Sequence, residues 1–284
     1  MKKILFLTVV SVTKLHERYV LIKLTDSEPL PDMVPGQFVE VRVDHSPTTF
    51  LRRPISVNFV DYSTNELWLL VAVVGEGTRS LSLLKTGDKV NCVLPLGNGF
   101  ASKTFESGFS SRGKNVQDAN TSLQKRFLLV GGGVGVAPLL YQGAELVKRN
   151  DIEVTFLLGA RTAKDLLLLD EFRKYGRVQT TTEDGSYGER GFVTNHSILL
   201  QECFDMIQCC GPTPMMRAVA RYAREKGIDC QVSLENMMAC GLGACLCCVE
   251  KVRRRDADGS VHERNVCVCK EGPVFNISEL LWHD

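Results

Sequence analysis

Residues 127–140 have the sequence FLLVGGGVGVAPLL, which joins an apolar strand to a helix through a glycine-rich turn. Glycines let the backbone approach a phosphate closely, the free N–H groups at a helix start face it, and Pro138 suits a first helical turn. The turn differs from the usual dinucleotide fingerprint because Val136 stands where the third glycine is expected. The turn alone therefore leaves two interpretations open, a nucleotide site or simply a tight turn.

The chain after this turn alternates between strand and helix patterns, which is typical of a doubly wound parallel sheet. Strands are expected at Phe127–Val130, Glu153–Leu158, 177–181, Asp205–Cys209 and Gln231–Leu234, and helices at Pro138–Arg149, 163–174 and Thr213–Gly227. The segment Cys210–Met215 repeats the strand, turn and helix arrangement with the sequence CGPTPM. Ligands bind beyond the carboxyl ends of strands in such sheets, so the two turns can flank one cofactor.

The first hundred residues contain short strand patterns separated by turn formers. These strands are expected at Ile4–Val12, Tyr19–Thr25, Gln37–Val43, Ile55–Val60, Glu66–Val74 and Lys89–Leu94. Their spacing predicts an antiparallel barrel or sandwich. One short helix is expected over Thr78–Leu84 with Thr78 as its N-cap. The polar segment 101–125 is interpreted as an insertion or linker loop.

Two motifs in this first region suit a phosphate-bearing ligand. Residues 52–56 have the sequence RRPIS, in which the arginine fork of donors suits a phosphate. The serine and the backbone N–H groups can bond the edge of a flavin ring. Residues 75–78, GEGT, provide a second helix start of phosphate size. The alternative interpretation of the first motif is an exposed basic turn.

Cysteines are concentrated near the carboxyl end, where seven of the 11 fall within residues 230–269. The spacing Cys240-x4-Cys245-x2-Cys248, followed by a distant cysteine, is that of plant-type [2Fe-2S] ligation. A zinc site formed by Cys245, Cys248, Cys267 and Cys269 is the alternative. Disulfides fit poorly because the count is odd and two of the cysteines, Cys247 and Cys248, are adjacent. We interpret Cys247 as a bystander.

Composition and charge restrict the remaining possibilities. The 284 residues suggest about two domains, and the net charge of +1 predicts no nucleic-acid or anionic-membrane partner. No apolar run is long enough for a transmembrane helix. The apolar run Ile4–Val10 is short and lacks a cleavage site, so we expect no secretory signal and a cytoplasmic protein.

Taken together, the motifs resemble the electron-transfer subunits of class B, NAD-dependent, dihydroorotate dehydrogenases, members of the ferredoxin reductase superfamily. The motifs that carry this resemblance, in chain order, are Pro35–Phe38, Leu51–Ser56, Gly75–Arg79, Pro95–Phe100, Gly131–Val136, Asp184–Gly188, Cys210–Met215, Cys240–Cys248 and Cys269–Phe275. Each motif alone is weak, whereas the series in this order is specific and covers nearly the whole chain.

The resemblance implies an FAD-binding antiparallel β-barrel at 1–100, a linker at 101–125, an NAD-binding α/β domain with a parallel sheet at 126–234, and a [2Fe-2S] loop region at 235–284. It implies that the FAD is held by Arg53, Pro54, Ile55, Ser56, Leu70, Val71, Ala72, Gly77 and Thr78. With this family in view, NAD(H) is assigned to Gly132, Gly133, Gly135, Cys210, Gly211 and Pro212. The implied cluster ligands are Cys240, Cys245, Cys248 and Cys269, with Cys269 preferred over Cys267 because it stands just before the Gly-Pro-Val-Phe segment at 272–275.

The resemblance further implies electron transfer between NAD and the FMN of a partner catalytic subunit, which converts dihydroorotate to orotate in de novo pyrimidine (UMP) biosynthesis. A heterotetramer of two subunits of each kind is implied, and we assign no catalytic residue to this chain. Val71 and Ala72 depart from a Tyr-Arg pair frequent in the family, and Arg161 leaves the choice of NAD or NADP open. The rival hypotheses are a related subunit serving a sulfide, sulfite, hydrogenase or ferredoxin partner, and a zinc-stabilised interaction module.

Overall fold

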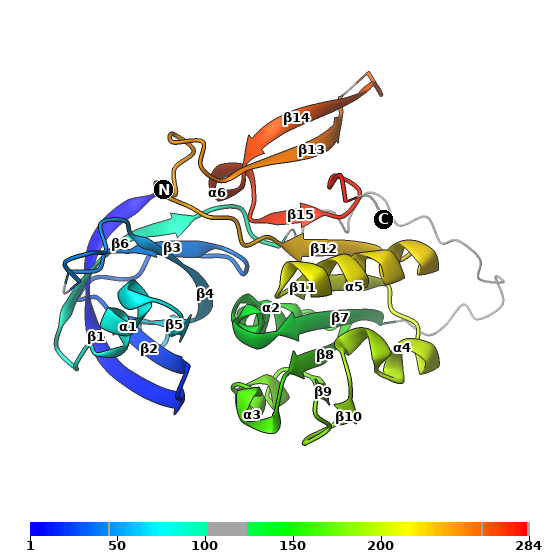
Figure 1. Cartoon of the computed structure of the whole chain (residues 1–284), viewed down its shortest axis with the longest axis horizontal. Helices are drawn as coiled ribbons and strands as arrows, with labels where there is room; N and C mark the ends of the chain where they lie inside the picture. The colour runs from blue at the N-terminus through cyan, green and yellow to red at the C-terminus, as the bar shows by residue number, and fades with distance from the viewer. Residues whose placement is uncertain (45, 101–123, 257, 283–284) are drawn as a thin grey trace.

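The computed structural model describes residues 1–44, 46–100, 124–256 and 258–282. These residues form a closed barrel, a seven-stranded sheet and a two-stranded hairpin (Figure 1). The predicted insertion at 101–125 lies almost wholly outside the described residues, since 101–123 are not among them. No helix in the described part of the chain is long and apolar enough to cross a membrane.

The amino-terminal barrel has its strands in the order β1-β2-β5-β4-β3-β6. All neighbouring strands are antiparallel, which confirms the predicted barrel. The strands are β1 (Lys3–His16), β2 (Tyr19–Thr25), β3 (Phe38–Val41), β4 (Arg53–Asp61), β5 (Glu66–Ala72) and β6 (Lys89–Leu96). Apolar side chains such as Val39, Val57 and Leu69 fill its interior because alternate residues of each strand point inward.

The short helix α1 (Glu76–Ser82) begins two residues earlier than predicted, and its N-cap is Gly75 instead of Thr78. The Thr78 hydroxyl instead accepts hydrogen bonds from the N–H groups of Val74 at 3.0 Å and Gly75 at 3.1 Å. Thr78 therefore caps the helix from its third position, so a capping residue was correctly recognised but its place in the helix was wrong.

The second sheet has the order β10-β9-β8-β7-β11-β12-β15, and its pairs are parallel up to β12. Its parallel strands are β7 (Lys125–Gly132), β8 (Ile152–Ala160), β9 (Arg177–Thr182), β10 (Glu189–Arg190), β11 (Met206–Cys210) and β12 (Asp229–Ser233). Its longer helices are α2 (Ala137–Leu146) and α5 (Thr213–Lys226), and its shorter ones are α3 (Leu169–Arg173), α4 (Ile198–Gln201), η2 (Gly133–Val136), η3 (Ala163–Asp165) and η4 (Val193–Asn195). The predicted alternation of strands and helices is confirmed.

One predicted helix of this domain, 163–174, is wrong. The chain instead forms the single turn η3, leaves helical geometry at Leu166 (ψ 112°), and re-enters a helix only after Leu168, which has a positive φ of 55°. The interruption buries the side chain of Leu167, so tertiary packing outweighs the helical pattern.

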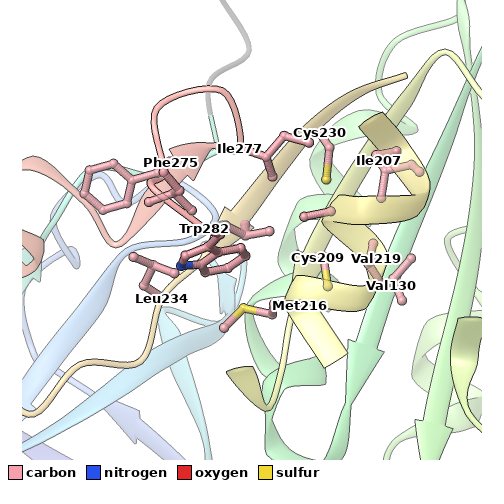
Figure 2. Packing of buried hydrophobic residues seen from close by; sticks show 14 of the residues in the cluster. Val130, Ile207, Cys209, Met216, Val219, Cys230, Leu234, Phe275, Ile277 and Trp282 are labelled. Carbon is pink, nitrogen blue, oxygen red and sulfur yellow. The ribbon is translucent and has the colours of Figure 1, made fainter. Parts of the chain in front are cut away.

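The cysteine segment joins the second sheet through its last strand. It contains the hairpin β13 (Val249–Arg255) and β14 (Val261–Cys267), the turn α6 (Val268–Glu271) and the strand β15 (Val274–Asn276), which pairs antiparallel with β12. Figure 2 shows Phe275, Ile277 and Trp282 packing beside Leu234 and Met216 in one apolar cluster. The cysteine segment therefore shares its core with the sheet domain.

Candidate functional site

A cleft of about 690 Å³ lies between the barrel and the carboxyl edge of the second sheet. The barrel contributes Tyr19 and Ala72 to its wall, and the sheet contributes the two turns that follow β7 and β11. The remaining lining residues used below are Gly159, Arg161, Thr181, Val193 and Glu235. The two predicted nucleotide turns thus open into a single cavity.

The two turns touch each other directly. A Cβ atom added at Gly135 would lie 2.5 Å from Gly211 Cα and 2.6 Å from Cys210 O, so only glycine fits there. Gly133 has φ +57°, a conformation that favours glycine. Five of the six residues assigned to NAD line the cleft, namely Gly132, Gly133, Gly135, Gly211 and Pro212.

Cys210 is the exception among these six residues. Its side chain is buried at the end of β11, and burial raises the pKa of its thiol far above the ordinary value. Cys210 can therefore support the turn only through its backbone.

Helix α2, which follows the first turn, is hydrogen-bonded to the barrel. The Asn58 side-chain N–H donates to Ala137 O at 2.9 Å, and the Tyr141 hydroxyl donates to Met33 O at 2.9 Å. Both contacts are buried, so the barrel and the glycine turn are held in a fixed relation. No sequence pattern distinguished Asn58 or Tyr141, since each contact joins residues far apart in the chain.

Arg53 and Gly77, both assigned to FAD, lie side by side at one end of the barrel. A Cβ at Gly77 would lie 2.9 Å from Arg53 Nε. Among the described residues no hydrogen-bond acceptor or ion-pair partner is found for the Arg53 guanidinium. Arg52, by contrast, donates to the backbone oxygens of Glu40 at 3.3 Å and Asn91 at 3.0 Å, and to the Asn91 side chain. Arg52 therefore supports the barrel, while Arg53 remains available to a phosphate, which fits an FAD pyrophosphate.

The other residues assigned to FAD divide between the two faces of their strands. Ile55 and Val71 line the barrel interior, so they can meet a ligand outside it only through their backbone. Pro54 and Ser56 lie on the opposite face of β4 and are half-buried. Leu70 packs in the apolar cluster between barrel and sheet, and Ala72 lines the cleft.

The cysteine loop directs several backbone N–H groups at one sulfur. Cys240 Sγ accepts the N–H of Leu242 at 3.3 Å. This bond, together with others from the Cys245 and Ala244 N–H groups, lowers the pKa of Cys240 to about 6. Gly241 and Gly243 have φ of +66° and +82°, so glycines are needed to bend the loop in this way. N–H donors around thiolate sulfur are a feature of iron–sulfur loops, so this loop fits such a cluster.

The remaining cysteines differ in their surroundings. Cys248 and Cys269 are buried, and the Cys269 N–H donates to Cys248 Sγ at 3.4 Å. Burial raises the pKa of Cys269 to about 12. Cys267 donates instead to Gly243 O at 3.8 Å, while Cys245 and Cys247 are exposed. In the described ranges no three or more His, Cys, Asp or Glu side chains are already gathered as a metal site.

Glu40 of β3 was missed by the sequence analysis. Its side chain is fully buried, and neither carboxylate oxygen has a hydrogen-bond partner among the described residues. It lies against the cysteine loop, since a Cβ at Gly241 would fall 2.6 Å from Glu40 Cγ. Burial raises its pKa to about 7, against the opposing charge of Arg52. No local signal identifies such a residue, because an outward-facing glutamate on a strand ordinarily meets solvent.

Two family models match separate parts of the chain. Residues 129–221 match the oxidoreductase NAD-binding domain, and residues 235–281 match the iron–sulfur cluster binding domain of dihydroorotate dehydrogenase B. The second match covers the cysteine loop, the hairpin and β15.

Curated relatives match most of the chain. The electron transfer subunit of dihydroorotate dehydrogenase B (NAD(+)) from Shouchella clausii is 39% identical over 250 residues, covering 87% of this chain and 86% of that protein. The subunit of the same name from Caldanaerobacter subterraneus is 39% identical over 248 residues, covering 87% of each chain.

Solved structures show the same architecture. The structure of an NADH-dependent reduced ferredoxin-NADP oxidoreductase covers 98% of this chain and 90% of its own, with a TM-score of 0.77 and 29% identity. The cytochrome b5 reductase domain of Ulva prolifera nitrate reductase covers 80% of this chain and 94% of its own, with a TM-score of 0.61. At 18% identity the latter shows the fold alone.

Proposed function

The chain belongs to the family of electron transfer subunits of NAD-dependent dihydroorotate dehydrogenase B, and from this premise we propose how its three sites divide the work. The barrel holds FAD, the cleft holds NAD(H), and the cysteine loop holds a [2Fe-2S] cluster. The observation that carries the proposal is the cleft itself, in which Ala72 of the flavin strand faces the glycine turns of the NAD-binding domain.

The FAD site consists of a charged end and a strand edge. The Arg53 guanidinium beside Gly77, at the start of α1, neutralises the pyrophosphate. The backbone of Pro54, Ile55 and Ser56 and that of Leu70, Val71 and Ala72 hold the ring. Small Ala72 lines the cleft and leaves the ring face open toward it.

The NAD site is made by backbone. Gly132, Gly133 and Gly135 let the pyrophosphate approach the start of η2 and α2, while Gly211 and Pro212 form the opposite wall. Cys210 supports this wall from the core. We propose NAD, not NADP, as the coenzyme, although Arg161 lines the cleft.

The proposed cluster ligands are Cys240, Cys245, Cys248 and Cys269. Their spacing is that of plant-type [2Fe-2S] proteins, and the loop N–H groups that already bond Cys240 stabilise negative charge on sulfur. Cys267, which bonds the loop backbone, is proposed to support the loop without ligating.

The order of the three sites follows from redox chemistry. When bound, the flavin links the two-electron chemistry of the nicotinamide to the one-electron chemistry of the cluster. The chain brings these sites together because β12 ends near Glu235 in the cleft and continues to Cys240 after a few residues. The turns therefore present the nicotinamide to Ala72, and the same strand carries the cysteine loop.

The electron partner is proposed to be the FMN-containing catalytic subunit, in a heterotetramer of two subunits of each kind located in the cytoplasm. Apolar side chains next to the cysteines support docking there. The exposed fraction is 82% for Met237, 47% for Leu242 and 64% for Leu246. Apolar surface of this kind is common at interfaces with other proteins.

A visible spectrum and two activity assays test the proposal. The purified chain is expected to contain flavin and iron with sulfide, to reduce an artificial dye with NADH, and to form no orotate. Orotate formation linked to NAD+ is expected only after the catalytic subunit is added.

The same assays can contradict it. A colourless zinc protein would refute both redox cofactors. Orotate formation by the chain alone would refute the division of work. A different co-purifying redox partner would refute the proposed pairing.

A further inference from the structure

Three neighbouring strands carry one row of paired positions to the cleft. Gly132 of β7 pairs with Gly159 of β8, which in turn pairs with Thr181 of β9. Paired positions of parallel strands point their side chains to the same face of the sheet. The β7 and β8 positions are glycine, so no side chain lies beside Thr181 from β8, whereas on its other side Thr181 pairs with Glu189 of β10.

The Thr181 hydroxyl is buried without a partner. Thr181 is 1% exposed, and its Oγ1 has no hydrogen-bond partner in the part of the chain that the structure describes. The next residue differs, since Thr182 Oγ1 donates to Tyr187 O at 2.9 Å and accepts the Tyr187 N–H at 3.1 Å. Buried polar groups are nearly always bonded, so the Thr181 hydroxyl requires an explanation.

Gly159 lies beside this hydroxyl at the wall of the cleft. Both residues line the cleft, and a Cβ at Gly159 would lie 3.3 Å from Thr181 Oγ1 and 2.6 Å from Val193 Cγ1. A side chain at 159 would therefore lie against both the hydroxyl and Val193. Thr181 therefore borders the space in which the coenzyme is proposed to bind.

The direction of the coenzyme in the cleft identifies what the hydroxyl meets. The nicotinamide must lie against the flavin strand at Ala72, and the pyrophosphate at the glycine turn after β7. The ends of β8 and β9 lie beyond that turn and away from β11 and β12, so they remain for the adenosine half.

We propose that the Thr181 hydroxyl hydrogen-bonds the adenosine half of the coenzyme, and that glycine at 159 leaves the space beside this hydroxyl free of a side chain. This inference rests on the proposed NAD site. One neutral hydrogen bond of this kind corresponds to an affinity difference of about 3- to 10-fold.

The test compares wild type, Thr181→Val and Thr181→Ser as the cofactor-loaded protein, using calorimetry with ADP-ribose and with nicotinamide mononucleotide. Valine has the shape of threonine without the hydroxyl, and serine retains the hydroxyl. We expect T181V to weaken ADP-ribose binding by about 3- to 10-fold and to leave nicotinamide mononucleotide binding unchanged. T181S should bind ADP-ribose within about 2-fold of wild type.

Melting temperature without coenzyme separates this role from a structural one. Removing an unbonded buried hydroxyl should leave the melting temperature of T181V equal or higher, whereas removing a structural hydrogen bond would lower it. ADP-ribose binding by T181V equal to that of wild type would overturn the inference, and Thr181→Ala provides the same comparison if T181V does not fold. Failure of wild type to bind NADH or ADP-ribose would instead overturn the proposed function.

Discussion

The nucleotide cleft and the cysteine loop differ in the groups that form them, which are backbone atoms in the cleft and side chains in the loop. The cleft is made by backbone whose position the sheet fixes, as the contact between Gly135 and Gly211 illustrates. The loop is made by side chains on irregular backbone, with Cys245 exposed and Leu246 at a positive φ of 58°. The comparison indicates that the fold itself shapes the cleft, whereas we expect the loop to depend on its metal for order.

The largest expected effect is a difference between the variants of two neighbouring cysteines, Cys269 and Cys267. Cys269→Ser should abolish the cluster, because it removes the buried thiol that is proposed as the fourth ligand, while the backbone N–H that bonds Cys248 Sγ is retained. Cys267→Ser, the matched control, should retain the cluster, because it removes only a long contact to Gly243 O. Iron and sulfide content with the low-temperature EPR spectrum of the reduced protein measures both.

These cysteine variants also test whether the nucleotide cleft is independent of the cysteine loop. NADH–dye reductase activity should survive in C269S, because the cleft does not depend on the loop cysteines. Loss of flavin and NADH binding together with the cluster would show that the two regions are not independent.

The next largest effect is expected for a substitution in the nucleotide cleft. Gly135→Ala forces a methyl group into the backbone of Gly211, which cannot move aside as a flexible side chain can. We expect a loss of about 3 kcal/mol of stability and a melting temperature lower by about 6 to 12 °C, with weaker NADH binding. Gly75→Ala is the control for stability, because its methyl would meet nothing within 4 Å. Equal melting of G135A and wild type would contradict the tight contact.

Glu40 lies between the barrel and the cysteine loop and should give the protein a pH-dependent stability. Burial raises its folded pKa to about 7 from the ordinary 4.5, so the folded state holds this proton more tightly than the unfolded chain. The stabilisation that this bound proton gives the folded state is complete below pH 4.5. It is lost as the pH rises to about 7, which lowers the unfolding free energy by up to about 3 kcal/mol. The Glu40→Gln side chain cannot titrate. Urea denaturation should therefore show that the unfolding free energy of E40Q rises relative to that of wild type between pH 4.5 and 8. A constant difference across this range would refute the assignment.

The smallest expected effect concerns the attachment of α2 to the barrel. Tyr141→Phe removes the buried hydrogen bond to Met33 O and should cost about 1 kcal/mol of unfolding free energy. Because the glycine turns keep their backbone contacts, the dissociation constant for NADH should change by less than about 3-fold. A large loss of NADH affinity would show that this hydroxyl, not the sheet, sets the geometry of the cleft.

The sequence predicted most of the strands and helices and the motifs, but few of the contacts between them. Strand alternation predicted the barrel, and the two turns at 131–135 and 210–215 correctly indicated both walls of the cleft. The helix at 163–174 failed because burying Leu167 outweighed local propensity. β15 was not predicted because a three-residue strand gives too weak a pattern, and its partner β12 lies far away in the chain.

Buried single residues were equally unpredictable. Glu40, Asn58 and Thr181 resemble ordinary strand residues, and only the fold shows that each is buried with at least one polar atom that lacks a partner among the described residues. Sequence periodicity indicates which face a side chain occupies, but not which distant segment covers it.

The most direct test of the account is anaerobic addition of NADH to the cofactor-loaded protein, followed by absorbance and EPR in wild type and C269S. The account predicts flavin bleaching in both proteins and the EPR signal of a reduced [2Fe-2S] cluster in wild type alone. Wild-type protein whose flavin is bleached by NADH while its cluster stays oxidised would contradict electron transfer through this chain.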